Sequence, residues 1–296
     1  MFSVLCQPLY LRPKGFIMEQ TNEKNDLKTL QVELTKMLAE FVAKCEEHDL
    51  RYYLFFGTLL GAVRHSGFIP WDDDIDILMP REDVEKFVEL YKDHYSDNAH
   101  LDAYNCPHYD SFAPNVRINS NNMMLRQDRN GQKAYVPAFL SIWIIDGLPD
   151  DPNKKKRHVK KIFRKYGILR LSRSAVQGTL KIKRSKKEQL LIAINRVLRI
   201  GKLFPPRKAA KAFNDTLKKY YWASGKECFI GWNPEENRLF QTEWFKDTAP
   251  AEFDGIKVTI PKGYDALLKR LYGNYMELPP EKDRHPIHST EIMFVD

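Results

Sequence analysis

The chain has 296 residues, of which 43% are hydrophobic and 29% charged, and this composition suits one large domain with a buried core, with or without a helical extension. No run reaches the roughly 18 consecutive apolar residues that a transmembrane helix needs. Four scattered cysteines without CxxC spacing argue against a zinc knuckle and predict the reduced thiols of a cytoplasmic protein.

The N-terminus is apolar from Met1 to Leu11, but no basic region precedes this stretch and no small-residue cleavage site follows it. We therefore expect no signal peptide. A second methionine, Met18, stands just before a polar stretch and a helical pattern, so residues 1–25 are predicted to be a loosely packed leader.

The net charge of +8 is concentrated in two segments. The first contains Lys154, Lys155, Lys156, Arg157, Lys160, Lys161, Arg164 and Lys165, and the second contains Lys181, Lys183, Arg184, Lys186 and Lys187. Two interpretations stay open: a solvated helix face, or a basic surface for anionic phospholipid, a polyanionic glycan or a nucleotide. Nucleic acid is not expected, because no aromatic side chains interleave with these charges as a stacking platform.

The first half of the chain alternates helical and extended patterns. Apolar residues at spacings of three and four predict a helix from Leu27 to about His48. The aromatic run Arg51–Phe56 predicts a strand, and a short helix is expected over Thr58–Arg64. Ile75–Met79 predicts a second strand, and Pro80 then suits the first turn of another helix.

The second half predicts further strands at Ala113–Ile118, Met123–Arg126 and Tyr135–Ile145, and a helix-rich basic region over 152–222. Asp254-Gly255 between apolar residues predicts a β-hairpin, followed by a helix over Tyr264–Tyr272. We divide the chain into a leader (1–25), a core (26–150), a basic helical insertion (151–225) and a C-terminal hairpin and helix that complete the core (226–296).

A phosphate seat is predicted where the first strand meets the short helix. The free backbone N–H groups and the dipole of that helix face the turn at Gly57 and Thr58. Glycine allows close backbone approach and threonine supplies a hydroxyl, a combination that suits a bound phosphate.

Four aspartates, Asp72, Asp73, Asp74 and Asp76, follow within five positions. On a strand, Asp74 and Asp76 share one face, about 7 Å apart at Cα. Two carboxylates so placed can converge on Mg²⁺, with Mn²⁺ as an alternative, and phosphate oxygens complete such a site. An acidic surface turn without a metal is the alternative interpretation.

Together, the strand, the Gly-Thr turn, the short helix and the D-x-D strand predict an α/β (α+β) nucleotidyltransferase-like fold with a mixed sheet and a basic helical extension. The sequence GTLLGAVRHSGFIPWDDDIDILMPR resembles the signature of the LicD family of phosphotransferases, to which fukutin and fukutin-related protein are distantly related. IIDGLP at 144–149 and IPKGYDALLKRLYGNYMELPP at 260–280 are similar to two further blocks of that family, so the resemblance spans about residues 27–290.

The resemblance implies Mg²⁺-dependent transfer of a phospho-alcohol, most typically phosphocholine from CDP-choline, to a hydroxyl of teichoic acid, capsule or lipooligosaccharide. It implies that Asp74 and Asp76 hold the metal, that Asp72 supports them, and that Gly57 and Thr58 face the donor phosphates. Arg64 is interpreted as neutralising the pyrophosphate, or as an ordinary surface salt bridge. The expected location is cytoplasmic, with peripheral contact at the inner face of the plasma membrane.

One position departs from the family pattern. The second block usually reads D-I-F-P-L-D, and here the first aspartate is replaced by Ser141 in LSIWIID. Asp146 is therefore predicted as the third catalytic carboxylate, or else as a turn residue before Gly147.

Trp71, Trp143 and Trp232 are candidates for cation–π binding of a quaternary ammonium, although core packing is the simpler interpretation. His285 and His288 are interpreted as ordering the C-terminal tail, with contact to phosphate or metal as the alternative. Two other functions stay open: a non-catalytic nucleotide- or glycan-binding relative, suggested by Ser141, and a small-molecule nucleotidyltransferase.

Overall fold

A computed structural model describes residues 23–103, 105–106, 115–129, 132–176, 203–231, 238–286 and 291–294. Most of the predicted leader, the second basic segment, Trp232 and His288 lie outside the described residues. Among the described helices, none has the length and apolar character that crossing a bilayer requires.

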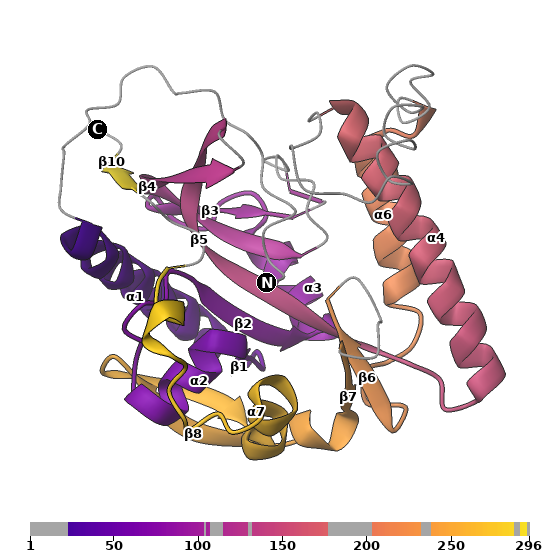
Figure 1. Cartoon of the computed structure of the whole chain (residues 1–296). Helices are drawn as coiled ribbons and strands as arrows, with labels where there is room; N and C mark the ends of the chain where they lie inside the picture. Colours follow the sequence, from indigo (N-terminus) through magenta and orange to yellow (C-terminus); the bar gives the residue numbers. More distant parts are fainter. Residues whose placement is uncertain are drawn as a thin grey trace.

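The centre of the molecule is an eight-stranded mixed sheet with the path β1-β2-β5-β4-β10; β3 also pairs with β4, and β6 joins β5 to β7. The strands are β1 Tyr53–Leu54, β2 Ile75–Pro80, β3 Ala99–Asp102, β4 Val116–Arg129, β5 Gln132–Gly147, β6 Glu227–Ile230, β7 Leu239–Gln241 and β10 Glu291–Phe294. Only the β2–β5 pair is parallel among the described strands. This mixed sheet with its helices confirms the predicted α/β class (Figure 1).

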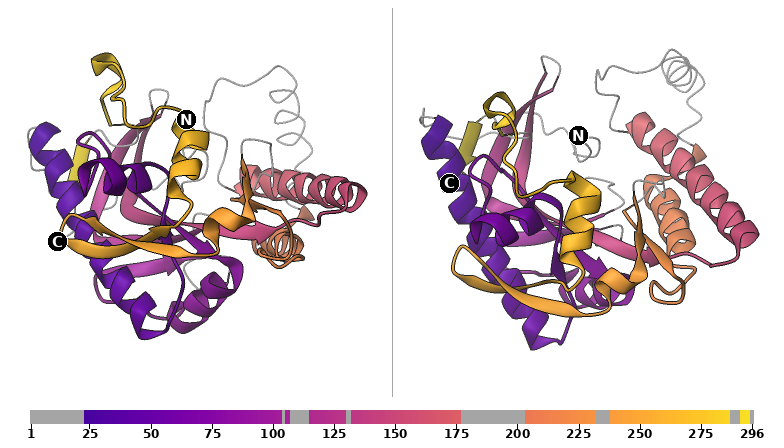
Figure 2. Two further views of the ribbon diagram at one scale, coloured as in Figure 1. Left: turned by 90° about the horizontal axis from the view of Figure 1, so that it is seen from below. Right: turned by 60° about the horizontal axis from the view of Figure 1, so that its bottom comes forward.

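The helices are α1 Glu23–Glu47, α2 Phe56–His65, α3 Arg81–Tyr91, α4 Pro152–Val176, α6 Pro206–Leu217 and α7 Tyr264–Tyr272, with the 3-10 turns η3 Thr242–Phe245 and η4 Glu281–Asp283. Each helix buries an apolar stripe; in α1, for example, Phe41 packs against Tyr52 and against Phe87 of α3. The helices α4 and α6 lie side by side at one end of the molecule (Figures 1 and 2).

The two faces of the sheet carry different helices. Ile144 of β5 lines a cavity together with Val84 of α3 and Phe213 of α6. Trp143, the preceding residue, contacts the aromatic ring of Phe56 in α2. Because successive side chains of a strand point to opposite faces, α3 and α6 cover one face and α2 covers the other.

The structure corrects several predicted boundaries. The first strand is only Tyr53–Leu54, because Phe56 already belongs to α2. Pro80 ends β2 and stands at the N-cap of α3, one position before the helix. The three short strands expected over 113–145 are two long strands, β4 and β5, paired with a register shift between Asn119 and Met124. The predicted helix over Tyr264–Tyr272 is confirmed.

A second sheet pairs β8 Thr248–Phe253 with β9 Ile256–Pro261, which confirms the predicted hairpin. At its tip, Asp254 and Gly255 have φ values of +46° and +81°, as a tight hairpin turn requires. The backbone N–H of Asp254 donates to the carbonyl of Ser66, 2.9 Å away. The hairpin tip therefore holds the start of the loop that leads from α2 to the aspartates.

Close contact between two glycines fixes the same loop from the other side. A Cβ atom on Gly61 of α2 would lie 2.4 Å from the carbonyl oxygen of Gly67. The contact is with backbone, which cannot move aside as the end of a flexible side chain can. Any larger residue at Gly61 would therefore push the loop away from α2.

We predict that Gly61→Ala lowers the free energy of unfolding by about 1–3 kcal/mol, because the added methyl group overpacks this contact. Gly167→Ala is the matched control, since Gly167 is also helical but a Cβ there meets no atom within 4 Å. The control should gain about 0.5–1 kcal/mol. Urea unfolding of both variants measures the difference, and equal stability would contradict this account of the loop.

Candidate active site

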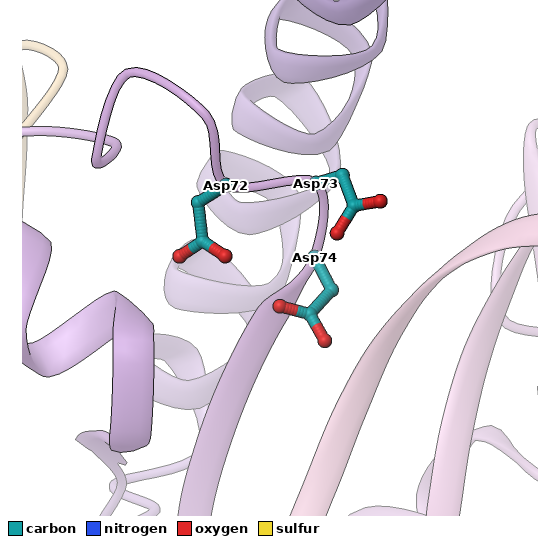
Figure 3. A group of neighbouring side chains, drawn as sticks. All are labelled: Asp72, Asp73 and Asp74. Atoms are coloured by element: carbon teal, nitrogen blue, oxygen red, sulfur yellow. The ribbon is translucent and has the colours of Figure 1, made fainter. Parts of the chain in front are cut away.

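The acidic loop forms a compact group of carboxylates directly before β2. One carboxylate oxygen from each of Asp72, Asp73 and Asp74 lies within 4.8 Å of the other two. Figure 3 shows that the side chains of Asp72 and Asp73 leave the chain in different directions. Asp73 is buried, whereas Asp72 and Asp74 are partly exposed. Hard oxygen ligands at this spacing fit a divalent cation such as Mg²⁺.

Asp76 lies inside the sheet, two residues beyond Asp74. Its backbone N–H donates to the hydroxyl of Thr58 at 2.9 Å, and its carbonyl accepts from the N–H of Phe55 at 2.9 Å. Its carboxylate oxygen Oδ1 accepts from the indole N–H of Trp143 at 2.7 Å. The main chain and the side chain of Asp76 are thus both held in place.

Tyr272 of α7 lies beside these aspartates. Burial, together with the negative charges of Asp76, Asp72 and Asp74, raises the pKa of the Tyr272 phenol. Tyr272 is therefore close enough to Asp72, Asp74 and Asp76 for their charges to act on its phenol, although 43% of the residue is exposed.

The N-terminus of α2 contributes to the same site. A Cβ on Gly57 would lie 2.8 Å from Oδ2 of Asp72, so glycine leaves room for this carboxylate at the positive end of the helix. Thr58 is buried, and its hydroxyl is engaged by the backbone of Asp76. Thr58 therefore helps to place Asp76, and the predicted contact of its hydroxyl with a donor phosphate stays a prediction.

Comparison with known proteins identifies the family. The family model described as "LicD/FKTN/FKRP, nucleotidyltransferase domain" matches residues 49–136, which include all four aspartates. "Lipopolysaccharide cholinephosphotransferase LicD" of Haemophilus influenzae is 31% identical over 284 residues, covering 91% of this chain and 98% of that protein. The chain belongs to the LicD family. It is accordingly an enzyme of the phosphotransferase class.

More distant similarity extends to animal proteins. "Ribitol 5-phosphate transferase FKRP" of Mus musculus is 28% identical over 145 residues, which is 40% of this chain and 28% of that protein. An uncharacterized protein of Rickettsia typhi, RT0683, is 42% identical over 69 residues, or 23% of this chain and 21% of that protein.

Asp146 does not join the aspartates of this LicD-family site. It is fully buried, and its two oxygens accept from Nε and Nη2 of Arg81 at 2.8 and 2.6 Å. Nη1 of Arg81 also donates to Asn214 of α6. Five positions separate Asp146 from Ser141, so the two side chains point to opposite faces of β5. The predicted catalytic role is therefore replaced by a structural one, which joins β5, α3 and α6.

Arg64 lies in a network of hydrogen bonds at the end of α2. Its Nη1 donates to the carbonyls of Tyr275 and Glu277, and its Nε donates to Nε2 of His65. Burial lowers the pKa of Arg64, and burial together with the Arg64 charge lowers that of His65, in keeping with a neutral imidazole that accepts this bond. Arg64 thus holds the segment after α7 against α2. Its charge acts on the Tyr272 phenol together with those of Asp72, Asp74 and Asp76, and its contact with the donor pyrophosphate stays a prediction.

The aromatic candidates for binding a quaternary ammonium, and the tail residue His285, have different surroundings in the structure. Trp143 is 1% exposed, so its ring is not open to a quaternary ammonium. Trp71 is partly exposed, and the guanidinium carbon of Arg284 lies 5.8 Å from its ring centre. His285 is exposed in the tail, where Nδ1 lies 3.2 Å from the carbonyl oxygen of Pro286. Tyr272, for which no sequence pattern supplied a signal, is a further aromatic residue near the aspartates, in addition to Trp143.

We predict that Asp146→Asn lowers the free energy of unfolding by about 3–5 kcal/mol, because it leaves the buried charge of Arg81 without its partner. Asp215→Asn is the control, because it removes only an exposed pair with Lys211 and should change stability by less than about 0.5 kcal/mol. Thermal unfolding measures both. An Asp146→Asn variant of unchanged stability that has lost transfer activity would restore the catalytic assignment.

Proposed function

We propose that this protein transfers a phospho-alcohol, phosphocholine first among the candidates, from a CDP-activated donor to a hydroxyl of a cell-surface glycan, with Mg²⁺ or Mn²⁺ as cofactor. The observation that supports this most directly is the group of carboxylates at Asp72, Asp73 and Asp74, directly before β2 and next to the N-terminus of α2. The Haemophilus relative is a lipopolysaccharide cholinephosphotransferase, which supports phosphocholine as the transferred group and a lipopolysaccharide-type acceptor. Teichoic acid and capsule stay alternative acceptors.

The chemistry follows from this arrangement. The acceptor oxygen forms a bond to the phosphorus that carries the alcohol, the anhydride bond breaks, and CMP leaves with its electron pair. The hydroxyl proton passes to a carboxylate of the site. A divalent cation held by Asp72, Asp74 and Asp76 would offset the charge on the leaving phosphate. The N-terminus of α2 and the fixed carboxylates orient the donor, which is the main contribution of protein groups to phosphoryl transfer.

Ser141 suggests a second candidate function. It lies directly across from Asp76 in the parallel β2–β5 register, at the place where the family pattern carries an aspartate. A serine hydroxyl is a weak base, so a chain that binds the donor without turning it over is the alternative. Calorimetric titration with CDP-choline and Mg²⁺, followed by a CMP-release assay, separates the two: binding without release of CMP favours the non-catalytic relative.

For the catalytic proposal, we expect Asp74→Asn and Asp76→Asn each to reduce CMP release by a factor on the order of 100 to 1000, because each removes charge from the site. Both variants should keep the circular dichroism spectrum of the unsubstituted chain. Asp247→Asn, at a carboxylate that is 70% exposed, is the control and should keep full activity. Full turnover in the Asp74 or Asp76 variant would exclude the aspartates as the reaction centre.

We further propose that the protein acts at the cytoplasmic face of the plasma membrane, held there by α4. This helix carries ten Lys and Arg residues and no Asp or Glu. Lys156, Lys160 and Arg164 are exposed and lie on one side of it at helical spacing, and the ring of Phe163 between them is 41% exposed. Cations beside an exposed apolar side chain suit a membrane surface better than a soluble polyanion.

Charge reversal tests this location. Lys156→Glu, Lys160→Glu and Arg164→Glu together should weaken binding to phosphatidylglycerol-containing vesicles on the order of 100-fold or more, from about 1 kcal/mol per cation. The control reverses three exposed lysines elsewhere, Lys246, Lys257 and Lys262. Co-sedimentation at low and high salt measures both. Equal loss in the two triple variants would indicate a non-specific effect of net charge and would exclude α4 as the docking element.

A further inference from the structure

Asp76 has a neutral partner on the neighbouring strand. The indole N–H of Trp143 donates to Oδ1 of Asp76 at 2.7 Å, and both side chains are buried. Trp143 and Ser141 lie two residues apart on β5 and therefore share the face that Asp76 occupies on β2. The β5 residues that face Asp76 are thus a hydroxyl and an indole, and neither carries a charge.

Trp143 is itself held tightly. The edge of its ring contacts Phe56 at 5.2 Å between centroids, and the guanidinium carbon of Arg238 lies 5.3 Å from the ring centre. The backbone at Gly231 has φ of +89°, and a Cβ there would lie 3.1 Å from Cζ3 of the indole. Only glycine lets the main chain pass so close, so the indole has very little room to turn.

These contacts have a consequence for the carboxylate. A fixed indole N–H directed at Oδ1 holds the Asp76 side chain in one rotamer, while Thr58 and Phe55 hold its main chain. Groups that orient a metal or phosphate ligand in this way set its affinity without touching the bound species. A neutral donor does so without placing a second negative charge next to Asp76.

We propose that Trp143 is the positioning residue of the phosphotransfer site, fixing Asp76 toward the cation and donor through its indole N–H. This inference rests on the proposed function, because it takes Asp76 to be a ligand of that site. It also implies that Ser141 has no direct part in orienting Asp76. In this chain, β5 orients Asp76 through a neutral donor and not through a further carboxylate.

The test removes the N–H and keeps the ring. In Trp143→Phe, an aromatic ring still packs against Phe56 and Arg238, and only the N–H donor is lost. The experiment measures binding of Mn²⁺ to the full-length chain through the electron paramagnetic resonance signal of the free ion. This readout does not depend on turnover. We expect the affinity for Mn²⁺ to fall by about 10- to 100-fold.

Trp222→Phe is the matched control. Trp222 is also buried, and its indole N–H donates to a carboxylate oxygen of Glu82 at 2.9 Å, outside the aspartate site. Both substitutions therefore remove one indole–carboxylate hydrogen bond, and both should lower the thermal unfolding midpoint by a few degrees. Only Trp143→Phe should weaken Mn²⁺ binding, whereas a purely structural role for Trp143 would leave the two variants alike.

The outcomes separate this inference from the proposed function. If the unsubstituted chain binds Mn²⁺ and Trp143→Phe binds it equally well, the positioning role is overturned and the proposed function stands. If the unsubstituted chain binds no Mn²⁺ and releases no CMP, both are overturned. Should Trp143→Phe fail to fold, Trp143→His supplies a smaller ring with an N–H donor, and the inference requires it to bind Mn²⁺ within about 10-fold of the unsubstituted chain.

Discussion

Repulsion among neighbouring carboxylates is the constraint on which this structure depends. Four aspartates within five positions cannot be brought together at low dielectric unless other groups hold them and compensate their charge. The chain meets this requirement with fixed donors and dipoles. The N-terminus of α2 meets Asp72, the side-chain amide of Gln31 donates to the carbonyl of Asp72 at 3.0 Å, and Thr58 and Trp143 hold Asp76. The same arrangement leaves a concentration of negative charge that favours a cation.

The opposite face of the sheet is organised around one buried ion pair. Arg81 follows β2 directly, and its bond to Asp146 ties the end of β2 to the end of β5, while Asn214 adds α6. A buried pair of this kind is weak evidence of net stabilisation, but it specifies how the elements fit together. Here it fixes the relative position of the two parallel strands, whose other face presents Asp76, Ser141 and Trp143. The face that carries the proposed site and the face that carries the ion pair are therefore connected through the same two strands.

Local sequence patterns predicted the elements that local physics determines. The aspartate strand, the hairpin at Asp254-Gly255 and the helix at Tyr264–Tyr272 follow from alternation, turn chemistry and helical spacing. Strand alternation, which places residues five apart on opposite faces, separates the side chain of Asp146 from that of Ser141. The long-range contacts of Thr58, Arg64 and Tyr272 do not follow from local patterns, since these partners lie 18 to 213 residues away in the chain.

The bond from Arg64 to the carbonyls of Tyr275 and Glu277 has a consequence for how the protein matures on the ribosome. The aspartates emerge from the ribosome long before Tyr272 and the segment that follows α7. Throughout that interval, a nascent chain contains the acidic loop but not Tyr272 or the segment that Arg64 binds. The surroundings of the aspartates are therefore completed only after the residues through Glu277 have been synthesised.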